Sequence, residues 1–236
     1  MIPAMERVAM SLYQKFLNFL PLRPRFLDPD RSSLSFRTLK NIQDATFRYK
    51  YKGRALLKNP FDLALYVRLI EQVRPGTIIE IGSYNGGSAL WFSAQCRALD
   101  LQTQIVSLDI TPVECDDDPN VRFIQGDIYS LDQSELTKIL ASCVRPLLVI
   151  EDGPHTFEGS LSALNFFDPH MQSGEYFVVE DGILEDLRYR ELKNGPKRAI
   201  KEFLATHPDN YRIDREYCDF YGRNVTWNIN GYLVKN

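Results

Sequence analysis

Residues 77–88 read TIIEIGSYNGGS, an apolar run that passes directly into a glycine-rich turn. A continuous apolar run of this length is typical of a strand that is buried on both faces of a parallel sheet. Glycines after such a strand permit positive φ angles and let the backbone approach a ligand closely. Ligands of open α/β sheets bind beyond the carboxyl ends of the strands, so this turn is a candidate binding site.

Four similar runs follow this strand along the chain. They cover residues 105–108, 121–124, 147–150 and 176–179, and helices are expected over 62–73 and 88–99. Short apolar strands that alternate with helices predict a mostly parallel sheet with helices on both faces. Segments 211–214 and 226–234 resemble strands with no helix between them, which predicts an antiparallel hairpin at the sheet edge. The expected fold class is therefore α/β, a Rossmann-like sandwich with a C-terminal antiparallel hairpin.

The N-terminal part of the chain follows a different pattern. Apolar positions at helical spacing predict a helix over residues 4–20 that ends before Pro21. We therefore divide the chain into an N-terminal helical extension, residues 1–50, and a main domain, residues 51–236. The extension is expected to serve packing, oligomer formation or a lid. A basic run between Arg37 and Lys58 predicts a solvated face or a local site for a polar or anionic substrate.

Composition and charge exclude several classes of protein. The 236 residues carry a formal net charge of −3, which gives no reason to expect nucleic acid as a partner. The four cysteines are scattered without a CxxC pair, which favours a reducing cytoplasm over a zinc site or a disulfide framework. No apolar run approaches the roughly 18 residues that a transmembrane helix needs, and the first residues lack a signal-peptide pattern.

The glycine-rich turn departs from the dinucleotide-binding fingerprint. It reads G-x-x-x-G-G instead of G-x-G-x-x-G, and Glu80 directly precedes Ile81 and the first glycine. A carboxylate there would repel a phosphate and attract a cationic amine or sulfonium. S-adenosylmethionine (SAM) carries both cations and has no phosphate. A tight turn in an unrelated α/β fold is the alternative.

Two further acids stand at the ends of the next strands. Asp109 follows the second strand, about 29 residues after Glu80, where it can accept hydrogen bonds from both hydroxyls of a ribose. Asp127 follows the third strand, where it can reach an adenine edge. The predicted cofactor-binding residues are Glu80, Gly82, Ser83, Tyr84, Asn85, Gly86, Gly87, Ser88, Asp109 and Asp127.

The fourth and fifth strands end in the same tripeptide, Glu-Asp-Gly, at residues 151–153 and 180–182. If these strands are neighbours, their carboxylates converge at one rim, which is costly unless a cation neutralises them. Oxygen donors are what Mg²⁺ and Ca²⁺ prefer. We predict a divalent metal that is held by Asp152, Glu180 and Asp181. The alternative is that these acids cap helix N-termini.

His155 lies three residues after Asp152, in a loop at the same rim. A histidine there can take a proton from a substrate hydroxyl near neutral pH. His155 and Asp152 are therefore the candidate catalytic residues. A structural histidine is the alternative.

In combination, these motifs resemble those of the cephalosporin hydroxylase family, which is similar to rhamnosyl and macrolide-sugar O-methyltransferases. The resemblance covers roughly residues 50–233 and rests on Lys58-x-Pro60-x-Asp62, Glu80-Ile81-Gly82 with Gly86-Gly87-Ser88, Asp152-x-x-His155 and Glu180-Asp181-Gly182. It implies a class I methyltransferase fold that binds SAM, commonly with Mg²⁺. It also implies metal ligands at Asp152, Glu180 and Asp181, a general base at His155, and a homo-oligomer.

The expected activity is a SAM-dependent, Mg²⁺-dependent O-methyltransferase that acts on a hydroxyl of a small molecule, such as a sugar or another natural product. One alternative is an NAD(P)-dependent oxidoreductase or hydroxylase component, against which Glu80 and the missing fingerprint argue. A second is a SAM-binding protein without turnover. A third is an RNA or DNA methyltransferase, which the sequence pI of about 5.7 disfavours.

Overall fold

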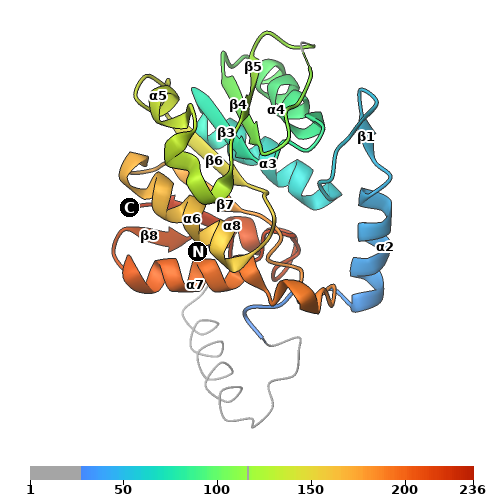
Figure 1. Ribbon diagram of the computed structural model, residues 1–236. Coiled ribbons are helices and arrows are strands. Elements are labelled where there is room, and N and C mark those ends of the chain that lie inside the picture. Colours follow the sequence, from blue (N-terminus) through green and yellow to red (C-terminus); the bar gives the residue numbers. More distant parts are fainter. Residues whose placement is uncertain (1–27, 116) are drawn as a thin grey trace, which may run out of the picture.

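The computed structural model describes residues 28–115 and 117–236, and the predicted helix over 4–20 lies outside them. Its centre is a seven-stranded sheet in the order β5-β4-β3-β6-β7-β9-β8 (Figure 1). The strands are β3 (Thr77–Ile81), β4 (Gln104–Asp109), β5 (Val121–Gln125), β6 (Leu147–Glu151), β7 (Tyr176–Val179), β8 (Tyr211–Ile213) and β9 (Tyr232–Lys235). The first five are parallel, and β9 runs antiparallel to both β7 and β8. The α/β, mostly parallel fold is thus confirmed.

Helices cover both faces of this sheet (Figure 1). The α-helices are α2 (Phe36–Thr46), α3 (Pro60–Val73), α4 (Gly87–Ala98), α5 (Leu136–Leu140), α6 (Phe157–Phe167), α7 (Gly195–Thr206) and α8 (Arg215–Cys218). Short 3₁₀ turns are η2 (Ile128–Gln133), η3 (Asp168–His170) and η4 (Arg190–Leu192), and β1 (Lys50–Tyr51) pairs with β2 (Arg54–Ala55) in a small hairpin.

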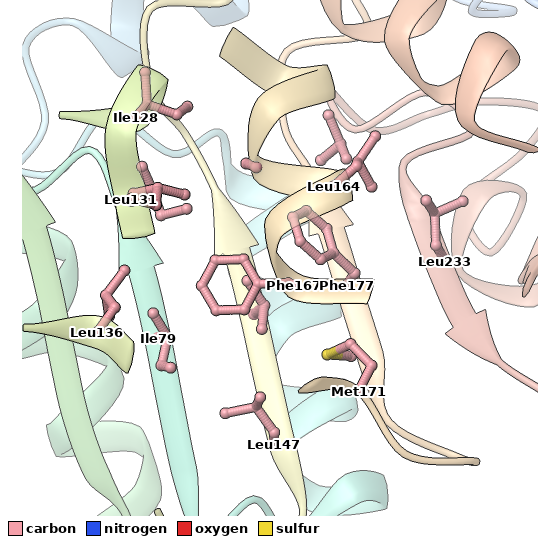
Figure 2. Packing of buried hydrophobic residues seen from close by; sticks show 14 of the residues in the cluster. Ile79, Ile128, Leu131, Leu136, Leu147, Leu164, Phe167, Met171, Phe177 and Leu233 are labelled. Carbon is pink, nitrogen blue, oxygen red and sulfur yellow. The ribbon is translucent and has the colours of Figure 1, made fainter. Parts of the chain in front are cut away.

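Two cores form because successive strand residues point to opposite faces of the sheet. Ile78 packs in the core under α3 and α4, whereas Ile79 packs in the core under α5, α6 and α7. Figure 2 shows the second core, where Phe167 of α6 lies over the sheet with Phe177 of β7. Burying each large apolar side chain contributes about 1.5–3 kcal/mol, so both cores fix the sheet that carries the strand ends.

Two glycines of the turn after β3 are required by the backbone. Gly82 has a φ of +101°, and a Cβ atom there would lie 1.9 Å from the carbonyl oxygen of Asp152. Gly86, with a φ of +82°, begins α4, and its Cβ would meet the ring of Phe123 at 2.7 Å. Glycine at these positions therefore brings the turn against β6 and leads into α4 without a clash.

The predicted strands and the helices over 62–73 and 88–99 are confirmed, and so is the antiparallel edge. Two details of that edge were wrong. The helix α8 stands between its strands, because Asp214 caps it by accepting a hydrogen bond from Glu216 N. Residues 226–231 precede β9 instead of extending it, because Asp62 of α3 accepts hydrogen bonds from the Thr226 hydroxyl and Trp227 N.

Within the described part of the chain, no helix has the length and hydropathy needed to cross a lipid bilayer.

Candidate active site

A cavity of about 750 Å³ opens where the parallel strands end. Residues at or just after the carboxyl ends of β3, β4, β5, β6 and β7 all line it, among them Gly82, Asp109, Asp127, Asp152 and Asp181. This is the edge at which the sequence predicted the ligand, because parallel strands present their carboxyl ends together.

Six of the ten predicted cofactor residues line the cavity, namely Gly82, Ser83, Tyr84, Ser88, Asp109 and Asp127. Four do not, namely Glu80, Asn85, Gly86 and Gly87. Gly87 lies under the β1–β2 hairpin instead, where a Cβ atom would sit 2.0 Å from the carbonyl oxygen of Ala55. The last part of the turn therefore serves packing, and its first part faces the cavity.

Asp109 organises the turn from the end of β4. Its Oδ2 accepts a hydrogen bond from Tyr84 N at 2.8 Å, and its Oδ1 accepts one from Thr111 N at 2.9 Å. Asp127 Oδ1 likewise accepts from Tyr129 N and caps η2. Each carboxylate oxygen has a second lone pair, so both acids fix the local backbone and still offer acceptors to a ligand.

Glu80 is fully buried beneath the turn. Its Oε2 accepts a hydrogen bond from Ser107 Oγ at 2.6 Å, and its Oε1 is buried without a hydrogen-bond partner among the described residues. Burial raises the pKa of Glu80, and the nearby ammonium of Lys58 opposes this effect. Glu80 thus supports the turn from beneath, and the acceptors that face the cavity are those of Asp109 and Asp127, which fit ribose hydroxyls better than a diphosphate.

Asp152, His155 and Asp181 form a compact group on the cavity wall. One ligand atom of each lies within 4.8 Å of the others, and His155 Nε2 is 3.1 Å from Asp181 Oδ2. His155 and Asp181 have φ angles of +56° and +57°, a left-handed conformation that is costly for residues with a Cβ. Such strain is concentrated at active sites. The structure thus brings together the predicted base and two of the three predicted metal ligands.

Two features of the surroundings of His155 shift its pKa in opposite directions. Burial lowers it, but the carboxylates of Asp181, Asp152 and Glu151 raise it more, and the net pKa lies above its ordinary value. The ring is therefore a stronger base than a free imidazole.

The sequence predicted that the basic run containing Lys58 is either a solvated face or a local site, and for Lys58 the solvated face is wrong. Arg37, Lys40, Arg48, Lys50 and Lys52 are exposed, but Lys58 is only 3% exposed. Its Nζ lies 2.8 Å from Asp152 Oδ2 and 2.6 Å from Glu180 Oε1. Burial lowers the pKa of Lys58, but these carboxylates outweigh it and raise the net pKa well above the ordinary value. Lys58 is thus an internal cation of the site.

Glu180, the third predicted metal ligand, lies beneath the cavity wall and outside the group of Asp152, His155 and Asp181. Its Oε1 accepts hydrogen bonds from the Tyr66 hydroxyl at 2.6 Å and from Lys58. Burial and the charge of Asp152 raise its pKa. Both of these contacts are made by Oε1, and its second carboxylate oxygen, Oε2, takes part in neither. An oxygen donor set of Asp152, Asp181 and this second oxygen is chemically suited to Mg²⁺.

The rest of the cavity lining includes segments to which the sequence assigned no site residue. They are α2, the loop after Asp181 and the segment before β9, and they contribute Gln43, Phe47, Leu184, Tyr189, Leu192 and Trp227. Trp227 Nε1 donates a hydrogen bond to the Gln43 side chain and so ties α2 to the main domain. These residues carry no local motif, although the fully buried Leu39 on α2 shows that this helix is packed.

Comparisons with known proteins relate this chain to methyltransferases. The family model described as Rhamnosyl O-methyltransferase/CmcI matches residues 43–236. A Rhamnosyl O-methyltransferase of Mycobacterium leprae (strain TN) is 27% identical over 194 residues, which are 78% of this chain and 82% of that protein.

Solved structures give the same result. A structure of CmcI with Mg and SAM has a TM-score of 0.64 and 25% identity, and the match covers 80% of this chain and 77% of that chain. A putative caffeoyl-CoA O-methyltransferase from Staphylococcus aureus, at 12% identity and a TM-score of 0.52, covers 99% of this chain and 100% of that chain, and shows the shared fold.

These matches confirm the class I methyltransferase fold and the enzyme class expected from the sequence, a SAM-dependent O-methyltransferase. The expected cofactors, SAM and Mg²⁺, are those present in the CmcI structure. The chain belongs to the Rhamnosyl O-methyltransferase/CmcI family.

Proposed function

We propose that this protein transfers the methyl group of SAM to a hydroxyl of a small polyhydroxylated acceptor, a sugar or a sugar-bearing natural product, with the help of a divalent metal. The observation that carries the proposal is the position of Asp152, His155 and Asp181 on the wall of the cavity that the glycine-rich turn also lines. The name of the mycobacterial relatives supports a sugar as the acceptor.

The turn side of the cavity is assigned to the cofactor. Bound SAM supplies a methyl group on a sulfonium, which is an intrinsically good leaving group. Asp109 and Asp127 offer acceptors to the nucleoside, and the backbone of Gly82 and Ser83 approaches it closely. Holding the two reactants together in this way can supply several kcal/mol of the barrier.

The rim side is assigned to the reacting hydroxyl. A divalent cation held by Asp152, Glu180 and Asp181 would lower the pKa of an acceptor hydroxyl. His155 accepts the proton of that hydroxyl. Because Asp181 faces Nε2, the neutral ring presents Nδ1 as its proton acceptor. Asp181 therefore also orients the base.

The α2 side is assigned to the body of the acceptor. Phe47, Tyr189 and Trp227 offer aromatic surface there, and Gln43 offers an amide. Aromatic faces suit the apolar C–H faces of a sugar or an attached apolar group. Amide groups suit its hydroxyls.

The sequence also predicts that the protein is a homo-oligomer and lies in the cytoplasm. Both remain predictions.

The test is methyl transfer from isotope-labelled SAM to a panel of rhamnosides, other glycosides and catechols, followed by mass spectrometry. Each assay is run with Mg²⁺ and with a chelator. We expect a methyl ether on a hydroxyl of a glycoside and loss of turnover in the chelator. Binding of SAM without turnover on any acceptor would favour a non-catalytic SAM-binding protein. Full turnover in the presence of the chelator would refute the proposed dependence on a divalent metal.

A further inference from the structure

A second cavity, of about 490 Å³, lies next to the first, and Tyr189 lines both. Besides Tyr189, the second cavity is lined by the charged residues Arg31, Glu185, Arg188, Arg190 and Lys193. Four cations against one acid make it strongly basic in a chain whose net charge is −3. We propose that this basic cavity binds a phosphate or diphosphate group of the acceptor while the acceptor's hydroxyl lies at His155. The inference rests on the proposed function.

The four cations are not equivalent, because only one of them has acidic partners among the residues that the structure describes. Arg31 forms ion pairs with Asp28, Glu185 and Asp186. Glu185 is also 3.1 Å from Lys197 Nζ, so the acid of the cavity is already shared between two cations. In contrast, Arg188, Arg190 and Lys193 form no ion pair with any residue in 28–115 or 117–236. Three positive charges of this cavity thus remain for a ligand.

The short segment that carries these three cations has a constrained backbone. Arg188, Lys193 and Asn194 have φ angles of +67°, +46° and +57°. Left-handed conformations at three residues with a Cβ cost free energy, and they persist only where the surroundings determine them. The guanidinium of Arg188 is also placed 4.0 Å from the ring centroid of Phe36 on α2. The segment between β7 and α7 therefore has a defined conformation, and this conformation positions its cations around the cavity.

The charge of the cavity selects among anions. Guanidinium groups match the oxygens of phosphate and carboxylate in a planar, bidentate geometry. A single carboxylate would neutralise one of the three cations and leave two of them close together. A phosphate monoester or a diphosphate carries two or more negative charges, so it is the better match. An acceptor of this class is a phosphorylated sugar, such as a sugar nucleoside diphosphate, which would span from one cavity into the other past Tyr189.

The test uses inorganic pyrophosphate as the probe, titrated calorimetrically into the full-length protein with S-adenosylhomocysteine in a chelator. The variant is Arg190→Gln/Lys193→Gln, because both side chains are exposed and make no ion pair among the described residues. The matched control is Lys201→Gln, an exposed lysine of α7 that lines neither cavity. We expect the Kd of pyrophosphate to rise at least about tenfold in the double variant and to stay unchanged in the control.

Two results overturn the inference. The first is no binding of pyrophosphate to the wild type, and the second is equal binding to the double variant. If pyrophosphate does not bind, and phosphatidylglycerol vesicles retain the wild type but not the double variant, the cations are assigned to a lipid surface instead. Binding of S-adenosylhomocysteine is measured in the same samples. Its absence would instead contradict the proposed function, so the two failures are distinguishable.

Discussion

The ammonium of Lys58 lies 2.6 Å from the Glu180 carboxylate, in the interior of the protein. The same ammonium is 2.8 Å from Asp152, so one internal cation serves two of the three proposed metal ligands. A bound divalent ion and Lys58 would share these carboxylates. Lys58 therefore opposes metal binding by its charge, and it also prevents Asp152 and Glu180 from repelling each other when the metal is absent.

The first prediction concerns Lys58→Met. Without the metal, the buried carboxylate of Glu180 and the partly buried one of Asp152 lose their counter-ion, and the free energy of unfolding should fall by about 3–5 kcal/mol. Removal of a positive charge near the ligands should tighten Mn²⁺ binding at least about tenfold. Thermal unfolding with MnCl₂ and with a chelator measures both effects, and the metal-induced rise in Tm should be larger in the variant than in the wild type.

The matched control is Lys40→Met, because Lys40 is exposed and pairs only with Asp44 one helical turn away. This variant should show the metal response of the wild type. If Lys58→Met gives the same Mn²⁺ affinity and the same metal-induced change in Tm as the wild type, Lys58 does not oppose the metal.

The second prediction concerns His155→Ala. Loss of the proton acceptor should reduce kcat by at least about 100-fold, because positioned acid–base groups contribute about 10²–10⁴. Affinity for S-adenosylhomocysteine should not change, since His155 is assigned to the acceptor side. His170→Ala, in η3 outside the cavity, is the control and should keep wild-type turnover. A kcat for His155→Ala within a factor of two of the wild type would remove the residue from the mechanism.

The strands and the rim of the site could be predicted from the sequence because their signals are local. An apolar run such as 77–81 predicts a buried strand by itself, and residues that end parallel strands must meet at one edge. Asp152, His155 and Asp181 follow from this rule alone. The same rule placed Glu180 at the rim, but it could not show that Tyr66 and Lys58 hold its Oε1 beneath the cavity.

The residues that the sequence did not reveal depend on contacts between distant segments. Gln43 lines the cavity because Trp227, 184 positions away, holds α2 against the main domain. Lys58 is buried because it pairs with Asp152 and Glu180, although the other lysines of the basic run are exposed. Neither hydrophobic periodicity nor composition reveals such pairings. The residues themselves therefore indicated only a basic run at Lys58, which is also part of the family motif Lys58-x-Pro60-x-Asp62, and no site residue on α2.

The third prediction concerns Gly82→Ala. A Cβ atom at this position would lie 1.9 Å from the Asp152 carbonyl oxygen, and the φ of +101° is unsuited to alanine. Strain and displacement of β6 together should lower the free energy of unfolding by at least about 3 kcal/mol. Gly53→Ala is the control, because Gly53 has a φ of +78° but nothing within 4 Å of its Cβ position. Gly53→Ala should lower the free energy of unfolding by only about 1 kcal/mol. Equal urea midpoints for the two variants would show that the close approach at Gly82 has no energetic role.

The fourth prediction concerns Asp62, which is 1% exposed and accepts hydrogen bonds from Trp227 N and the Thr226 hydroxyl. Burial raises its pKa from the ordinary 3.8 to about 6, although these hydrogen bonds oppose the rise. The folded state therefore binds a proton more tightly than the unfolded state does. By linkage, the contribution of Asp62 to the free energy of unfolding falls as pH rises from about 4 to about 6, and it is constant above that.

The difference between about 6 and 3.8 corresponds to about 3 kcal/mol, at about 1.36 kcal/mol per pH unit. Asp62→Asn cannot titrate, so its free energy of unfolding should not carry this decline. The variant should be less stable than the wild type near pH 4, because its amide NH₂ faces donors, and the deficit should shrink by about 3 kcal/mol by pH 7. Urea unfolding of both proteins at four pH values between 4 and 7 measures this. A deficit that is constant across the range would mean that Asp62 titrates as an ordinary exposed aspartate, and that its burial is offset in full by the hydrogen bonds from Thr226 and Trp227.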